Sequence, residues 1–170
     1  RKVAIKEFFM KDMCCREEDT NQVYYISSDS NFVDNFKNKF IKEAQTISSL
    51  NHRNIIRIHD TFEENGTAYY AMEYIDGCSI SDILKQQGKL QEDVAIQYIK
   101  EVAEALNYIH SKHINHLDIK PSNIMVRQVD NSVVLIDFGV AKQYDLLTDE
   151  GTTSTPVGVS HGYSPLEQYS

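Results

Sequence analysis

Oxygen-bearing side chains stand at the ends of two short apolar stretches in the second half of the chain. Asn123 directly precedes the stretch 124–127, and Asp137 directly follows the stretch 133–136. A turn-forming Asp-Asn-Ser sequence separates the two stretches, which predicts an antiparallel hairpin with both side chains at the same end. Two such side chains suit a hard cation such as Mg²⁺, which takes few protein ligands. The spacing therefore predicts Asn123 and Asp137 as metal ligands.

The loop just before this hairpin carries groups that could move a proton. Asp118 and Lys120 lie there, and Pro121 stiffens the backbone after them. A carboxylate beside a metal site can accept a proton from a hydroxyl group, which makes Asp118 a candidate general base. The simpler alternative is a polar turn with chance acidic residues, but this combination at this spacing favours the catalytic interpretation.

Two charged residues in the first half fall on otherwise apolar faces. Lys6 shares a face with Ala4 in an alternating segment, and Glu43 lies three residues after Phe40 and four before Ile47. Burying an unpaired charge is costly, so each charge could satisfy the other. From these residues alone, a helix-edge glutamate and a surface lysine with a buried stem remain the simpler alternative.

Hydrophobic periodicity and turn residues predict the elements that position these groups. The order of strands and one helix, then helices, then a hairpin predicts an α+β fold in two unequal lobes, over 1–75 and 76–170. From residue 140 onward the composition predicts a long mobile loop. The predicted elements are a strand over 3–6, a polar insertion over 11–31 with a short strand over 23–26, a helix over 33–50, strands over 55–62 and 68–75 around a turn at 64–66, helices over 79–87 and 91–111, and strands over 124–127 and 133–136.

Composition limits the classes of protein to which the chain can belong. Its 170 residues are 41% hydrophobic and 25% charged, values typical of one globular domain. The net charge of −8 argues against binding to nucleic acid or to an anionic membrane surface, and no apolar run reaches the ~18–20 residues of a membrane helix. Cys14, Cys15 and Cys78 lack zinc-type spacing, so we expect reduced thiols and a cytoplasmic location. Arg1 opens the chain within a strand pattern, so we expect a piece of a longer protein.

Four segments together resemble the catalytic domain of Ser/Thr protein kinases. They occur in the order and spacing of that family, and the run 162–168 is most similar to its bacterial members. The resemblance implies a two-lobed protein-kinase-like fold, incomplete at both ends, with ATP, Mg²⁺ and a Ser/Thr-bearing protein substrate as partners. The segments are Val3-Ala4-Ile5-Lys6, His116-Leu117-Asp118-Ile119-Lys120-Pro121-Ser122-Asn123, Asp137-Phe138-Gly139 and Pro165-Leu166-Glu167.

The resemblance also implies a role for each matching residue. Asp118 would orient the substrate hydroxyl and Lys120 would reach the γ-phosphate. Lys6 would hold the α- and β-phosphates and pair with Glu43, and Asn123 and Asp137 would hold Mg²⁺. For adenine, the resemblance implies Ala4 and Met125 on the two ring faces, Met72 as gatekeeper, and the backbone of Glu73 to Ile75 as hinge. Ser160 resembles the residue that contacts the catalytic base, and Ile47, Ile58, His116 and Phe138 resemble an interlobe hydrophobic column.

The chain departs from the family in three respects. No Gly-rich loop precedes the first strand, no large-lobe helices follow Glu167, and Leu117 stands where the family usually has Arg. We therefore expect the isolated segment to be inactive, and activation by phosphorylation of the loop is in doubt. Two alternatives stay open: a pseudokinase acting as a scaffold, and a small-molecule kinase of the same group. The Lys120-Pro121 pair and the 165–167 ending argue against the second.

Overall fold

The computed structural model describes residues 2–26, 30–138, 142–143 and 159–169. These divide into two compact units, residues 1–49 with 57–74 and residues 50–56 with 75–170. The α+β fold class is confirmed, since both helices and sheets are present. Gly139 and residues 144–158, which include most of the predicted mobile loop, lie outside the described residues.

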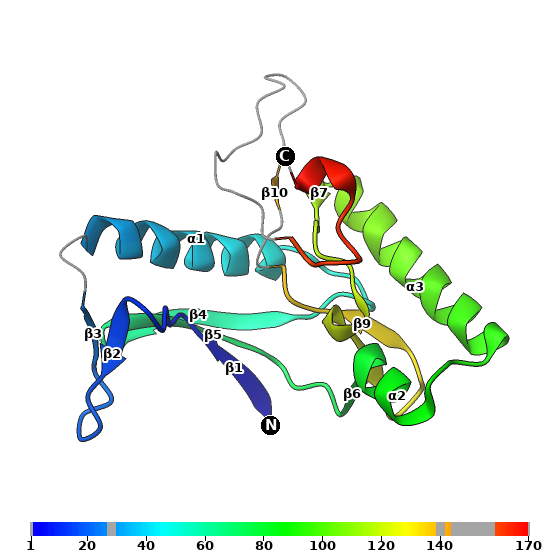
Figure 1. Cartoon of the computed structure of the whole chain (residues 1–170), viewed down its shortest axis with the longest axis horizontal. Helices are drawn as coiled ribbons and strands as arrows, with labels where there is room; N and C mark the ends of the chain where they lie inside the picture. The colour runs from blue at the N-terminus through cyan, green and yellow to red at the C-terminus, as the bar shows by residue number, and fades with distance from the viewer. Residues whose placement is uncertain (1, 27–29, 139–141, 144–158, 170) are drawn as a thin grey trace. The chain divides into compact units, whose positions relative to one another are not determined.

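The first unit is built on a three-stranded antiparallel sheet, ordered β1-β5-β4, with one long helix packed on it (Figure 1). Val33, Ala44 and Ile47 form the buried stripe of the helix, as its periodicity predicted. Phe40 of the helix stacks on Tyr70 of β5 with ring centroids 4.9 Å apart. The elements of the unit are β1 (Val3–Glu7), β2 (Cys14–Arg16), β3 (Val23–Tyr25), α1 (Ser30–Ser48), β4 (Ile58–Glu64) and β5 (Thr67–Glu73).

The polar insertion predicted over 11–31 contains a β-hairpin formed by β2 and β3. The short strand predicted over 23–26 is confirmed as β3, but β2 was not predicted. Its residues are polar or small, and the only buried side chain among them is Cys14, which clusters with Val23 and Val33. Because Val33 belongs to α1, β2 gains its apolar partner only through tertiary packing.

The β4–β5 turn is where the hairpin approaches the sheet. The Val23 backbone N–H donates to the Asn65 carbonyl at 2.8 Å. Gly66 has φ +72°, and a Cβ there would lie 2.5 Å from the Val23 carbonyl oxygen. Left-handed backbone and close approach therefore both require glycine at this position.

We predict that Gly66→Ala destabilises the protein by more than the ~1–2 kcal/mol that left-handed backbone alone costs a residue with a Cβ. Gly88→Ala is the matched control, because Gly88 also has positive φ but its added Cβ would meet nothing within 4 Å. The free energy of unfolding in urea gives both values. An equal or smaller loss at Gly66 would show that the hairpin does not press on this turn.

The second unit contains a three-stranded sheet ordered β6-β8-β9 and two helices. Ser79 caps α2 by accepting a hydrogen bond from the Asp82 backbone N–H at 3.1 Å, and Gly88 ends the helix. The longer α3 packs against β9 and β7 (Figure 1). The elements are β6 (Gly77–Ser79), α2 (Ile80–Gln87), α3 (Glu92–His110), β7 (Ile114–Asn115), the 3-10 turn η1 (Pro121–Asn123), β8 (Ile124–Arg127), β9 (Val133–Leu135), β10 (Lys142–Gln143) and the 3-10 turn η2 (Leu166–Gln168).

The segment 50–56 belongs to the second unit, whereas the sequence placed it in a first lobe over 1–75. The Ile56 N–H donates to the Leu135 carbonyl at 3.0 Å, and the Leu135 N–H donates to the Asn54 carbonyl at 2.8 Å. Asn54 Nδ2 also donates to the Val133 carbonyl and to Glu101 of α3, at 2.7 and 3.0 Å. The strand predicted over 55–62 is therefore wrong at its start: it begins at Ile58, because the preceding isoleucines are buried beside β9.

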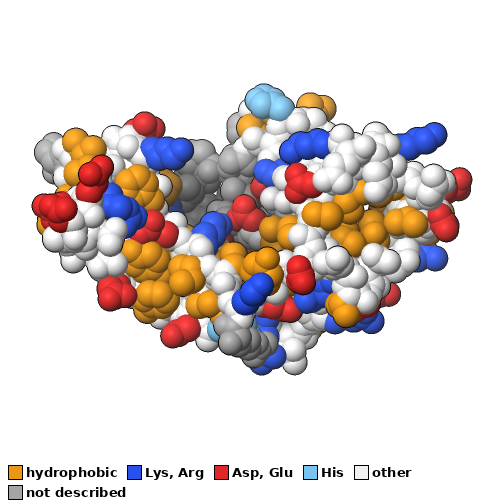
Figure 2. Space-filling model, turned by 90° about the horizontal axis from the view of Figure 1, so that it is seen from below, with side chains coloured by type: hydrophobic (Ala, Val, Ile, Leu, Met, Phe, Trp, Pro, Cys, Tyr) orange, Lys and Arg blue, Asp and Glu red, His pale blue; other side chains and the backbone are white. Residues whose placement is uncertain are grey.

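The remaining predicted elements are confirmed within a few residues at their ends. The strands β6, β7 and β10 were not predicted, since each has only two or three residues. Among the described residues, no helix is both long and apolar enough to cross a membrane. Figure 2 shows hydrophobic side chains among the charged groups on one face of the molecule. The exposed hydrophobic residues of the chain include Ile5 of β1 and Ile99 of α3.

Candidate active site

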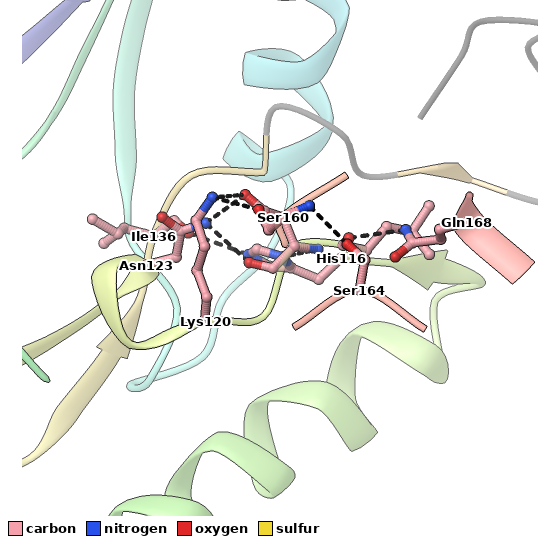
Figure 3. Close-up of polar contacts among 9 residues, drawn as sticks. His116, Lys120, Asn123, Ile136, Ser160, Ser164 and Gln168 are labelled. Atoms are coloured by element: carbon pink, nitrogen blue, oxygen red, sulfur yellow. Dashed lines mark hydrogen bonds and ion pairs between the residues drawn. The ribbon is translucent and has the colours of Figure 1, made fainter. Parts of the chain in front are cut away.

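Three polar side chains of the predicted catalytic loop converge in the second unit. Lys120 Nζ lies 2.8 Å from Asp118 Oδ2, and Asn123 Nδ2 donates to the same oxygen at 2.8 Å. Ser160, 42 residues after Asp118, donates its hydroxyl hydrogen to Asp118 Oδ1 at 2.5 Å. Lys120 Nζ in turn donates to Ser160 Oγ at 2.8 Å. Figure 3 shows the side chains of Lys120, Asn123 and Ser160 gathered at this point.

The loop is shaped by local backbone bonds. Lys120 is extended and Pro121 begins the 3-10 turn η1, which suits a residue with fixed φ and no N–H. The Asn123 N–H donates to the Lys120 carbonyl at 2.9 Å. Asn123 is 5% exposed, and its Nδ2 donates to the Asp118 carbonyl as well as to the carboxylate. The amide oxygen of Asn123 is therefore the atom left to bind another group.

His116 supports the loop from within the core. It is 1% exposed and its ring packs on Phe138 with centroids 4.4 Å apart. The Asp118 N–H donates to His116 Nδ1 at 3.3 Å, and His116 Nε2 lies 3.2 Å from the Ile136 carbonyl. Because Nδ1 accepts, Nε2 carries the proton and donates to Ile136. Burial lowers the pKa of His116, although Ile136 and the nearby carboxylates oppose the shift, so the ring is neutral at neutral pH.

Asp137 follows Ile136, whose backbone N–H and carbonyl are both hydrogen-bonded. The Ile136 N–H donates to the Asn123 carbonyl at 2.9 Å, and its carbonyl faces His116 Nε2 at 3.2 Å (Figure 3). Asp137 itself is exposed and adopts φ 59°, a left-handed conformation that Asp and Asn tolerate best after glycine. The hairpin of β8 and β9 thus brings the backbone before Asp137 to Asn123, as the sequence predicted.

The electrostatics of Asp118 favour the ionised carboxylate. Burial raises the pKa of Asp118, but hydrogen bonds from Lys120, Ser160 and Asn123 and the charge of Lys120 outweigh burial and leave the pKa below its ordinary value. The side chain is 14% exposed. An ionised carboxylate that already accepts a hydroxyl hydrogen is suited to orient a reacting hydroxyl group.

Gln168 makes a contact with the loop that was not predicted from the sequence. Its Nε2 donates to the Leu117 carbonyl, 51 residues earlier, at 3.0 Å (Figure 3). Leu117 has φ 63°, and a leucine in left-handed backbone is strained. Ser164 was also missed; its Oγ accepts from the Ser160 N–H at 2.9 Å. No local pattern marks these two residues, because both act on partners that only the fold brings near.

The candidate phosphate-binding residues of the first unit lie on β1 and α1. Lys6 Nζ lies over the Tyr70 ring, 5.7 Å from its centroid. Glu43 is half-buried, with Oε1 shielded from solvent. The Lys6 ammonium group thus lies beside β5, the strand against which α1 packs. The Lys6–Glu43 ion pair stays a prediction.

The predicted adenine-binding residues are divided between the two units. Ala4 of β1 pairs with Met72 of β5, and both are half-buried. The Glu73 N–H donates to the Arg57 carbonyl at 2.8 Å, so a backbone contact from Glu73 to a base would use its carbonyl oxygen. Ile75, which is buried, and Met125, which is half-buried on β8, belong to the second unit. Their role in binding adenine stays a prediction.

The donor set fits a hard cation with few protein ligands. Asn123 offers an amide oxygen and Asp137 an exposed carboxylate. No cluster of three or more His, Cys, Asp or Glu side chains occurs among the described residues. Mg²⁺ needs only one or two carboxylates in addition to phosphate oxygens.

This chain is similar to known proteins over most of its own length. The family model of the protein kinase domain matches residues 11–167. The serine/threonine-protein kinase PknB of Mycobacterium leprae is 35% identical over 131 residues, which cover 75% of this chain and 21% of that protein. Serine/threonine-protein kinase B of Synechocystis is 36% identical over 150 residues, covering 84% of this chain and 26% of that protein. The solved PpkA-294 apo form aligns with a TM-score of 0.76 at 28% identity, covering 82% of this chain and 50% of that one.

The matches cover the part of the chain that holds most of the candidate site. The chain spans about a fifth to a quarter of the length of the curated relatives it matches. The matched region includes Asp118, Lys120, Asn123 and Asp137, and the fold agrees with that of a solved relative. The chain therefore belongs to the protein kinase domain family.

Proposed function

We propose that the protein transfers the γ-phosphoryl group of ATP to a Ser or Thr hydroxyl of a protein substrate. The observation that carries this proposal is the position of the Ser160 hydroxyl. It donates to Asp118 Oδ1 at 2.5 Å while it accepts from Lys120 Nζ at 2.8 Å. A substrate hydroxyl engaged in the same way would have its oxygen lone pair oriented and its proton directed to a base.

The reaction follows from these contacts. The substrate oxygen bonds to the γ-phosphorus, the bond from that phosphorus to the β-bridging oxygen breaks, and ADP leaves. The hydroxyl proton passes to Asp118 Oδ1, and the ammonium group of Lys120 stabilises the negative charge of the transferred group. The lowered pKa of Asp118 keeps the carboxylate ionised to hydrogen-bond the substrate before transfer.

Other residues would bind the nucleotide. Asn123 Oδ1 and the Asp137 carboxylate would hold Mg²⁺, which supplies charge neutralisation for the phosphates. Lys6 would contact the α- and β-phosphates, and Glu43 would hold Lys6 in place. Adenine would be bound by the predicted set Ala4, Met72, Glu73, Ile75 and Met125.

Partners and compartment are inferred from family membership, charge and cysteine chemistry. Membership of the protein kinase domain family supports a protein substrate, and the net charge of −8 argues against nucleic acid or an anionic membrane surface as a partner of this segment. Cys14, Cys15 and Cys78 are free thiols, two of them exposed. Exposed free thiols are typical of reducing compartments, which supports the cytoplasm as the location.

The test is phosphoryl transfer by the purified full-length protein. We expect incubation with Mg-ATP and a mixed protein substrate to yield phosphoserine or phosphothreonine, identified by mass spectrometry. Nucleotide binding without any transfer would support a pseudokinase instead. Transfer only to small molecules would support the second alternative.

A further inference from the structure

The β2–β3 hairpin is attached to the sheet at several points. Its strand β3 binds the β4–β5 turn through the Val23 N–H and the Asn65 carbonyl, at 2.8 Å. Its strand β2 binds β1 through Arg16 and Glu7, whose side chains are 2.5 Å apart. The Thr67 hydroxyl donates to the Phe8 carbonyl at 2.5 Å, just where the chain leaves β1 for the hairpin. The hairpin is therefore fixed to the strand that carries Lys6.

A polar chain links the same hairpin to α1 and to β4. The Tyr25 hydroxyl donates to Asp34 Oδ1 in the second turn of α1, at 2.9 Å. Lys37 Nζ lies 3.7 Å from Asp34 Oδ1 and 3.2 Å from Glu63 Oε2 of β4. Burial and the hydrogen bond to Asp34 raise the pKa of Tyr25, so its hydroxyl stays protonated and acts as the donor. This link holds the start of α1 in one direction.

Apolar packing attaches the hairpin, and the Tyr25–Asp34 bond sets its geometry. Cys14, Val23 and Val33 are each no more than 5% exposed, and Phe8, Phe9, Met10, Met13 and Tyr25 pack around them. Such burial is non-directional and contributes more to the docking free energy than one hydrogen bond. A hydrogen bond to a carboxylate is directional, which makes Tyr25 the residue best placed to fix the orientation of the helix.

The helix held in this way carries Glu43 near its other end. Phe40 lies between Asp34 and Glu43 along α1, and its ring stacks on Tyr70 of β5 with centroids 4.9 Å apart. Lys6 of β1 lies over the same Tyr70 ring. A change in the orientation of α1 at Asp34 would therefore displace Glu43 relative to Lys6 of β1. Because α1 is 19 residues long, a small rotation at one end produces a larger displacement at the other.

We propose that Tyr25, through Asp34, is a positioning residue that orients α1 so that Glu43 and Lys6 are arranged to bind the phosphates of ATP. This proposal rests on the proposed function for its ligand. The proposal gives the β2–β3 hairpin a role in the affinity for ATP. A polar insertion that made no contact with α1 would have no such role.

The experiment compares Tyr25→Phe with the unchanged full-length protein in two measurements. Hydrogen–deuterium exchange of α1 amides should become faster in the variant, because the ring stays packed while the bond to Asp34 is lost. The dissociation constant of a non-hydrolysable ATP analogue with Mg²⁺, measured by calorimetry, should rise about three- to tenfold. Asp34→Ala should reproduce both effects, and Asp34→Asn, which keeps an acceptor oxygen, should restore much of the affinity.

Tyr24→Phe is the matched control. Tyr24 precedes Tyr25 on β3, points to the opposite face of the hairpin and is 51% exposed. Both measurements should be unchanged in this variant. In the double variant Tyr25→Phe with Asp34→Ala, the loss of affinity should equal that of Asp34→Ala alone, as for two members of one interaction.

Two results would overturn the proposal. The first is unchanged hydrogen–deuterium exchange of α1 in Tyr25→Phe. The second is faster exchange with unchanged affinity for the ATP analogue, because Tyr25 would then have a purely structural role. Failure of the proposed function is distinguished by the unchanged protein. Analogue binding without phosphoryl transfer would refute the transfer reaction and still allow the positioning effect to be measured. Absence of analogue binding by the unchanged protein would refute both.

Discussion

Asp118→Asn is expected to lower kcat of the full-length protein by about 10²–10⁴-fold, the usual contribution of a general base. Asn keeps the size of the side chain and one acceptor oxygen, which can still accept from Lys120 and Asn123, whereas its amide nitrogen would donate to Ser160 Oγ instead of accepting from it. What it removes is the charge and the oxygen that would take up the hydroxyl proton. We expect KM for ATP to change little, because Asp118 acts on the hydroxyl rather than on the nucleotide.

Initial rates of ATP-dependent substrate phosphorylation measure this effect. Asp130→Asn is the matched control, because Asp130 makes the same kind of contact, to Ser132 Oγ at 2.6 Å, on the turn at the other end of the hairpin. The Asp130→Asn variant should phosphorylate the substrate at the same rate as the unchanged protein. A kcat for Asp118→Asn within a few-fold of the unchanged protein would exclude Asp118 as the base.

Asp137→Asn is expected to reduce turnover at least about 100-fold while the fold survives. A bound metal supplies several kcal/mol of charge stabilisation, and each ~1.4 kcal/mol corresponds to tenfold in rate. Asp137 is exposed and left-handed at φ 59°, and Asn accepts that backbone as readily as Asp. The substitution therefore removes the negative charge of a proposed metal ligand without adding backbone strain, which Asp137→Ala would add.

The dependence of turnover on Mg²⁺ concentration distinguishes a metal ligand from a structural residue. We expect the small residual activity of Asp137→Asn to need more Mg²⁺ for half-saturation, with a thermal midpoint close to that of the unchanged protein. The reciprocal change Asn131→Asp is the control, because Asn131 is also left-handed, at φ 56°, on the same hairpin. Unchanged turnover in Asp137→Asn would refute the mechanism proposed here.

The order of chemical groups and most regular elements could be predicted from the sequence. Helices α2 and α3 and the strands β8 and β9 have strong periodicity or clear boundary residues, such as Ser79 and Gly88 at the ends of α2. The convergence of Asp118, Lys120 and Asn123 could be expected because the outer two, Asp118 and Asn123, are only five positions apart in the chain. Local spacing is sufficient where the interacting groups are near neighbours in the chain.

The sites where the short apolar segments are buried are known from the tertiary structure alone. Ile55 and Ile56 have the composition of a strand continuous with Ile58, yet backbone hydrogen bonds of Asn54 and Ile56 with Leu135 place them in the second unit. The β2–β3 hairpin is polar in sequence and gains its core from Val33. A segment of a few residues cannot select its partner by its own pattern, because the free energy of burial depends on the surface it meets.

The same distinction applies within the candidate site. The sequence predicts the kinase-like order of Lys6, Glu43, Asp118, Asn123 and Asp137, because the proposed chemistry of each position requires its residue type. The resemblance to protein kinases predicted the contact of Ser160 with Asp118, and the structure confirms it. Only the fold shows that Gln168 donates to the carbonyl of the strained Leu117 and that Tyr25 binds Asp34 of α1. Gln168 reaches a partner 51 residues away, and no local periodicity can encode a contact at such a separation.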